Sequence, residues 1–176
     1  MKKKFWWIII GVVVVIILLI LLIPKKKLVS FDGFEFPETV KVENSTDYKI
    51  DTISMILANK VFEWDSLRLI LFYLPELDND EVEFKGIVQQ LPFVQNSYLL
   101  LLNRNLGFDE VLTVLSHEFI HIEQYKTKRL VVSGKEYWWE GEYGVFDSYD
   151  TSRPFEVEAF SGQSKVKKEL KKIIYE

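Results

Sequence analysis

The chain begins with a long apolar run that lysines bracket on both sides. Residues 5–23 carry no charge, and as a helix rising about 1.5 Å per residue they would extend roughly 28 Å, the thickness of a bilayer core. Lysines occupy 2–4 and 25–27, and two tryptophans stand at the start of the run, as at a membrane interface. Residues 22–25 offer no small-residue cleavage site, which argues against a signal peptide. The pattern predicts one transmembrane helix.

Beyond residue 27, the apolar positions change repeatedly between strand-like and helix-like spacing, which predicts an α+β domain. The expected elements are short strands within 28–50, a helix over 51–62 capped by Asp51, strands over 67–74, 82–88 and 97–103, a helix from 109 into the basic residues at 126–129, a hairpin or irregular segment over 131–145, and a last helix from 154 to about 174. We therefore expect a membrane anchor over residues 1–27 and one domain over 28–176.

Charge distinguishes these two parts of the chain. Of 22 Lys and Arg residues, six lie within 1–27, whereas all 26 Asp and Glu residues lie beyond. An acidic domain lacks the basic surface that binds phosphates, so no nucleic acid partner is expected. The expected partners are the lipid bilayer through residues 5–23 and a peptide or protein substrate. The balanced lysines leave only a slight preference for placing the domain of this single-pass membrane protein on the non-cytoplasmic face.

Residues 117–121 read His-Glu-Phe-Ile-His, within a predicted helix. Residues four apart share one helix face, so the imidazoles of His117 and His121 can reach the same metal ion. Glu118 is turned about 100° from His117, beside the metal, where it can take a proton from a metal-bound water. Coincidence is the alternative, because two buried histidines can also form ordinary core hydrogen bonds.

A catalytic zinc ion needs a third protein ligand and keeps one position for water. The chain has two histidines and no cysteine, so that ligand must be a carboxylate. Glu156, near the start of the last predicted helix, is the favoured candidate. Helix chemistry explains Glu156 equally well, because an acidic residue in the first turn stabilises the helix dipole without a metal. Glu158, about 200° around the helix from Glu156, is the alternative third ligand.

The HEFIH motif, followed 35 residues after its second histidine by Glu-x-x-Ala, resembles the gluzincin class of zinc metallopeptidases. It is most similar to the small catalytic cores of the CaaX prenyl protease type, in which Ser-Arg often precedes the third ligand. The resemblance covers roughly residues 97–165. It implies a zincin-like domain, in which a short sheet packs on the HExxH helix and on a C-terminal ligand helix. One Zn²⁺ would be bound by His117, His121 and Glu156, with Glu118 as general base.

The sequence departs from the family pattern at one position, and the family also predicts which strand lines the cleft. Phe160 stands where the family usually has an aspartate, so support for a histidine ligand must come from elsewhere. In the family, the strand before the motif helix lines the cleft as an edge strand and holds an extended peptide, a place that residues 97–103 would take.

Hydrolysis of a peptide bond builds negative charge on the carbonyl oxygen, so a hydrogen-bond donor is expected beside it. The candidate donors are Tyr137, Tyr143, Tyr149 and Arg153.

The predicted function is a membrane-anchored zinc metallopeptidase that hydrolyses peptide bonds with a zinc-activated water and Glu118 as general base. A catalytically inactive module that keeps the peptidase fold for binding is one alternative. A metal-free structural domain at a membrane surface is the other.

Overall fold

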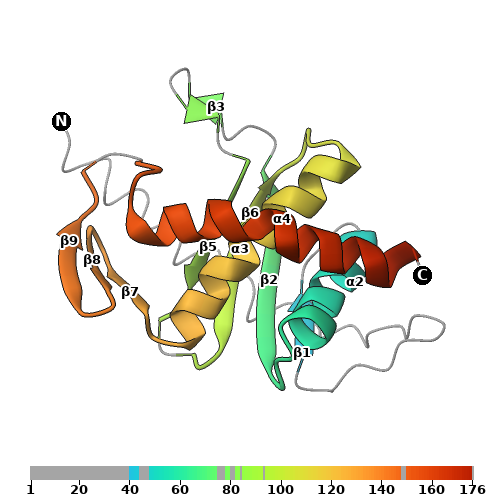
Figure 1. Cartoon of the computed structure of the whole chain (residues 1–176), viewed down its shortest axis with the longest axis horizontal. Coiled ribbons are helices and arrows are strands. Elements are labelled where there is room, and N and C mark those ends of the chain that lie inside the picture. The colour runs from blue at the N-terminus through green and yellow to red at the C-terminus, as the bar shows by residue number, and fades with distance from the viewer. Residues whose placement is uncertain are drawn as a thin grey trace. The chain divides into compact units, whose positions relative to one another are not determined.

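The computed structural model describes residues 40–43, 48–74, 78–79, 82–83, 85–92, 94–147 and 150–175. All of these residues belong to one compact unit, Glu35–Glu176. The elements named below therefore form a single α+β domain (Figure 1).

A four-stranded sheet in the order β1-β2-β6-β5 forms the centre of the domain. Strands β1 (Val40–Glu43), β2 (Leu67–Leu74) and β6 (Ser97–Asn103) run parallel, and β5 (Gly86–Gln90) runs antiparallel to β6 at one edge. In β6, alternate side chains including Leu100 and Leu102 are fully buried, and those between them are half-buried. The apolar run of β6 thus lies inside the sheet and not at its edge.

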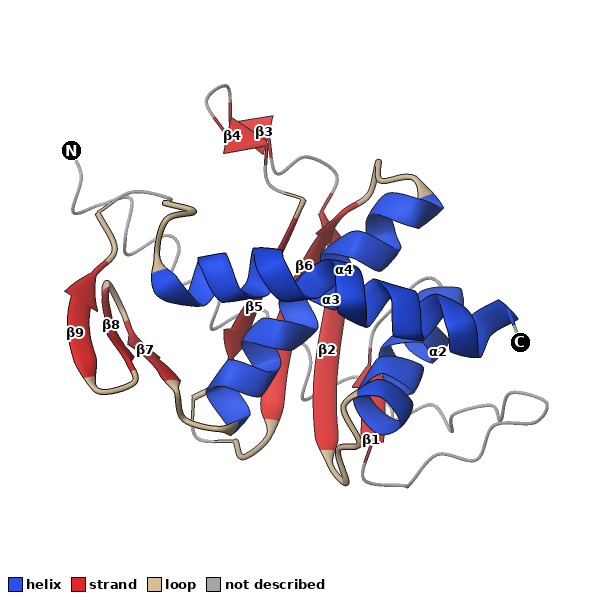
Figure 2. Cartoon of the chain, viewed as in Figure 1, coloured by secondary structure: helices blue, strands red, loops and turns tan. Residues whose placement is uncertain are grey.

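Helices α3 (Phe108–Lys126) and α4 (Pro154–Tyr175) lie on one face of this sheet, where α4 crosses α3 (Figure 2). Glu110 accepts a hydrogen bond from the Gly107 N–H at 3.1 Å, which satisfies one of the unpaired donors at the start of α3. Proline favours the first helical position because it has no N–H to pair, and α4 begins at Pro154 as the sequence predicts.

Helix α2 (Tyr48–Ile56) leads into a short π-helix, η1 (Leu57–Val61). The sequence predicts this region as one helix that starts at Asp51. The structure starts it three residues earlier, so Asp51 lies inside the helix and is not its cap. Strand β2 has the predicted bounds, whereas the predicted strand over 82–88 is divided between β4 (Val82–Glu83) and β5. Strand β4 pairs with β3 (Asp78–Asn79).

A three-stranded antiparallel sheet connects α3 to α4. Its strands are β7 (Leu130–Ser133), β8 (Glu136–Trp139) and β9 (Glu142–Val145). Gly134 and Gly141, with φ of 63° and 90°, form the two tight turns, a backbone conformation that glycine adopts without strain. Buried side chains from β7, β8 and α4 pack together beneath this sheet, namely Leu130, Trp139 and Phe155.

The structure corrects one part of the predicted fold class, the N-terminal transmembrane helix, and with it the predicted single-pass membrane location. Within the described part of the chain, no helix combines the length and the apolar character that a membrane crossing requires. Helices α3 and α4 are long enough, but each carries charged residues along its length. Residues 5–23, to which the prediction referred, lie outside the described residues.

Candidate metal centre

The HExxH motif lies in the middle of α3, where α4 crosses it. His117 and His121 are 9 % and 7 % exposed, and their Nε2 atoms lie 3.1 Å apart. Glu156, in the first turn of α4, places Oε2 3.3 Å from Nε2 of His117 and 3.5 Å from Nε2 of His121. Two helices thus bring three ligand atoms around one point, and this group can hold a metal ion.

Each of the three atoms that converge can donate a lone pair to a metal ion when the imidazoles are neutral and carry their proton on Nδ1. Burial raises the pKa of Glu156, but the two imidazoles beside it outweigh that effect and hold its pKa at about 2. For His121, burial lowers the pKa of the imidazole. Contact with Glu156 and the charge of the nearby Glu118 outweigh that effect, so the pKa of His121 is raised. A lowered carboxylate pKa beside a raised imidazole pKa means that the site favours positive charge next to an ionised carboxylate, which is compatible with a bound cation.

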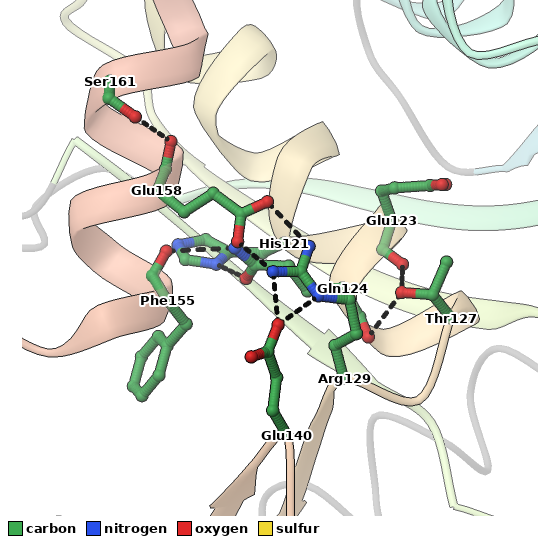
Figure 3. A network of polar contacts seen from close by, with 9 residues as sticks. All are labelled: His121, Glu123, Gln124, Thr127, Arg129, Glu140, Phe155, Glu158 and Ser161. Carbon is green, nitrogen blue, oxygen red and sulfur yellow. Dashed lines mark hydrogen bonds and ion pairs between the residues drawn. The ribbon is translucent and has the colours of Figure 1, made fainter.

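Each imidazole is held by different neighbours. Nδ1 of His121 lies 2.8 Å from Oε1 of Gln124, whose Nε2 donates to the carbonyl oxygen of Phe155 at 3.0 Å (Figure 3). The ring of His117 packs against Phe160, with centroids 4.5 Å apart. Among the described residues, Nδ1 of His117 has no hydrogen-bond partner.

Glu158, the alternative third ligand, is held away from this group. Its two carboxylate oxygens each accept a hydrogen bond of 2.8 Å from the Arg129 guanidinium, which also bonds Glu140 (Figure 3). The bidentate geometry engages both oxygens. The structure therefore brings Glu156, and not Glu158, to the two histidines.

Glu118 lies beside the metal group and against the edge strand. The side chain is 5 % exposed, and its carboxylate accepts a hydrogen bond from the backbone N–H of Val88. Oε1 would lie 3.4 Å from a Cβ atom placed on Gly86. Burial raises the pKa of Glu118, which the positive charges of His121 and His117 partly oppose. A raised pKa makes this carboxylate a stronger base than an exposed one, as a residue that accepts a proton requires.

A cleft of about 870 Å³ opens over the three ligands and Glu118. Strand β5 forms one wall, with residues 86–88, and side chains from α4 and the segment before it form another. Beyond the ligands, the cleft is bounded by the apolar side chains of Leu130, Phe146 and Phe155. The lining thus combines apolar side chains with a smaller number of polar and charged groups, a mixture typical of a site that binds an organic ligand.

The candidates for stabilising negative charge differ in their positions. Arg153 lines the cleft, is only 8 % exposed, and has its guanidinium over the Phe146 ring at 4.8 Å. Tyr137 packs against Phe155 in the small sheet, and Tyr143 is 59 % exposed, where its hydroxyl donates to Glu136. Tyr149 lies outside the described residues. Of the described candidates, Arg153 alone lines the cleft.

Two features of the site were not predicted from the sequence. Gln124 contacts both His121 and α4, and its spacing of three residues from His121, on the helix face that carries both histidines, was the signal that could have identified it. Strand β5, rather than β6, forms the edge beside the motif, which corrects the expectation for residues 97–103.

Comparisons of the chain with protein families, with curated proteins and with solved structures find no match. The chemistry of the site is therefore what bears on the function of the chain.

Proposed function

We propose that the chain is a zinc-dependent metallopeptidase of the gluzincin type, with its metal bound by His117, His121 and Glu156. The observation that carries the proposal is the spacing of the three ligand atoms, which lie 3.1, 3.3 and 3.5 Å from one another. Bonds of about 2.0–2.1 Å directed to the corners of a tetrahedron place neighbouring ligands about 3.3 Å apart. The group therefore matches three corners of a tetrahedral zinc site.

The type of donor supports the same metal. Two neutral imidazoles with one carboxylate form the ligand set of many catalytic zinc sites, in which the fourth position is left for water. Oε2 of Glu156 is buried, and its polar neighbours are the Nε2 atoms of the two histidines, at 3.3 and 3.5 Å. An ionised oxygen in that situation needs a compensating cation. The ligands thus fit a zinc ion both in distance and in charge.

A zinc ion bound there would polarise a substrate carbonyl and lower the pKa of a water molecule. The residues of the chain supply the rest of the reaction. Glu118 takes a proton from the attacking water and passes it to the leaving amine, a role for which its raised pKa is suited. Arg153, at the wall of the cleft, is the candidate hydrogen-bond donor to the carbonyl oxygen as it gains negative charge.

The edge strand supports a peptide as substrate. Within the described chain, β5 pairs on one side only, with β6, and residues 86–88 line the cleft beside Glu118. An extended peptide can add to such an edge through main-chain hydrogen bonds, which do not depend on its sequence. In this arrangement a scissile bond can lie between β5 and the metal group.

Replacement of Glu118 by Gln tests the proposal, because it removes the base and keeps the side-chain shape. We expect Glu118→Gln to retain stoichiometric zinc, measured by mass spectrometry, and to lose about 10²- to 10⁴-fold in cleavage of a fluorescently labelled unstructured protein. Glu158→Gln is the matched control, since it removes a carboxylate outside the metal group and should leave cleavage intact. Cleavage by Glu118→Gln at the native rate would remove Glu118 from the mechanism.

One observation favours the alternative of an inactive binding module. Phe160 packs on His117 where the family usually has an aspartate, and within the described chain Nδ1 of His117 has no hydrogen-bond partner. Loss of such a partner lowers the basicity of a ligand and weakens metal binding. Stoichiometric zinc binding without cleavage of any peptide in a broad library would favour this module over the peptidase.

A further inference from the structure

Gln124 is a buried amide on α3 that contacts both helices of the metal centre. It is 1 % exposed and lies almost one helical turn after His121. Its Oε1 lies 2.8 Å from Nδ1 of His121, and its Nε2 lies 3.0 Å from the carbonyl oxygen of Phe155 (Figure 3). A polar group this deeply buried is costly to leave unpaired, and here both ends of the amide have partners.

The contact with α4 determines which way the amide faces. A backbone carbonyl can only accept a hydrogen bond, so the nitrogen of Gln124 must be the atom that faces Phe155. The oxygen then faces His121, and Nδ1 of that imidazole must be the donor. In neutral His121, Nε2 is therefore unprotonated, and its lone pair is available on the side where His117 and Glu156 lie.

The same amide also bonds to the backbone of α4, the helix that carries Glu156. Phe155 directly precedes Glu156, so the bond from Gln124 tethers the first turn of α4 to α3 at the residue beside that ligand. One side chain thus orients an imidazole and anchors the backbone that carries the third ligand. Phe160, on the next turn of α4, contributes no hydrogen bond to a histidine and packs on His117 instead.

We infer that Gln124 is a positioning residue of the metal centre, which selects the metal-binding tautomer of His121, while its bond to Phe155 stabilises the packing of α4 on α3. The inference rests on the proposed metal centre and extends it, because Gln124 gives His121 the supporting hydrogen bond that, among the described residues, Nδ1 of His117 lacks. Partners of this kind are typically worth 10- to 100-fold in metal affinity. An ordinary buried hydrogen bond between two helices would contribute to stability alone.

Three variants of the full chain separate these roles. Gln124→Met keeps an unbranched side chain of similar length and removes both hydrogen bonds. Gln124→Glu keeps an oxygen acceptor for His121 and removes the donor to Phe155. Ser116→Ala is the control, because Ser116 is a fully buried residue of α3 whose hydroxyl, within the described part of the chain, bonds the Leu112 carbonyl alone, at 2.7 Å.

The measurements are zinc affinity by competition with a chromophoric chelator, the visible spectrum of the Co²⁺ form, and urea unfolding of the metal-free protein. We expect Gln124→Met to bind zinc about 10- to 100-fold more weakly and to alter the Co²⁺ spectrum. Gln124→Glu should stay within about threefold of the native affinity although its metal-free form is less stable. Ser116→Ala should lose stability without losing affinity.

Native zinc affinity in Gln124→Met would overturn the inference and leave the peptidase proposal intact. If Gln124→Met does not fold without metal, the zinc affinity of Gln124→Glu tests the inference. A tenfold weaker affinity in that variant would show that the oxygen acceptor for His121 does not determine zinc binding. Failure of the native chain to bind zinc or Co²⁺ would overturn both proposals. Zinc binding that depends on Gln124, without any peptide cleavage, would refute the peptidase alone.

Discussion

Gly86, on the edge strand beside Glu118, is predicted to be intolerant of a single added carbon. A Cβ atom there would lie 2.4 Å from Cγ1 of Val114 and 3.3 Å from Cδ2 of Leu102. Carbon atoms in contact lie about 3.5–4.0 Å apart, so Val114 would have to move by about 1 Å or more. Valine in a helix is almost confined to one χ1 rotamer, which leaves displacement of β5 or α3 as the response.

Two opposing effects decide the sign of the change in stability. Replacing glycine by alanine reduces the entropy of the unfolded chain and stabilises by about 0.4–1 kcal/mol where the backbone permits it. Overpacking a buried contact typically costs about 1–3 kcal/mol. Because the contact with Val114 is so close, we expect overpacking to prevail and Gly86→Ala to lower the free energy of unfolding by about 1–2 kcal/mol. The measurement is urea unfolding of the metal-free protein.

A second substitution tests the cause. Val114→Ala removes the methyl group that the new Cβ would meet, so the double variant should be more stable than the sum of the single changes predicts, by about 1 kcal/mol or more. Gly86→Ala with native stability, or strictly additive effects of the two substitutions, would show that the strand and helix are not as closely packed as described. Displacement of β5 should also disturb Glu118, so Gly86→Ala is expected to reduce cleavage.

Further expectations concern the two carboxylates of α4 and the start of α3. Glu156→Gln should lower zinc affinity by at least about tenfold. Glu158→Gln removes one partner of the partly exposed ion pair with Arg129. It should lower the free energy of unfolding in urea by at most about 1 kcal/mol and leave zinc affinity unchanged. Equal affinities in the two variants would reassign the third ligand. Two lysines of α4 hydrogen-bond to Asp109 and lower the pKa of its carboxylate from 3.8 to about 2. Because the folded-state pKa is lowered, this contribution to stability is present above pH 4 and is lost as the pH falls through about 2. Asp109→Asn should therefore be less stable than the native chain at pH 7, the two should converge near pH 2, and high salt should reduce the difference.

Local sequence was sufficient to predict the elements with a strong pattern. Strand β2 and strand β6 have the predicted bounds, and α4 begins at Pro154. The near-continuous apolar run of β6 is typical of a parallel strand inside a sheet. Its assignment to the cleft edge came from the resemblance and was wrong, because the short strand β5 pairs outside it. Strand β5 has a weak pattern, since most of its side chains are exposed and, within the described residues, it pairs with β6 alone.

The shared helix face of His117 and His121 follows from local sequence, because a spacing of four residues fixes their relative direction within one helix. Which carboxylate joins them depends instead on how two helices pack. Glu156 and Glu158 lie on different sides of α4, and the crossing of α4 over α3 directs one to the histidines and the other to Arg129. The orientation of the Gln124 amide was decided in the same way, since its Nε2 reaches Phe155 across 31 positions of sequence. Helical periodicity acts over a few residues, whereas the angle and register of two packed helices depend on side chains throughout the domain.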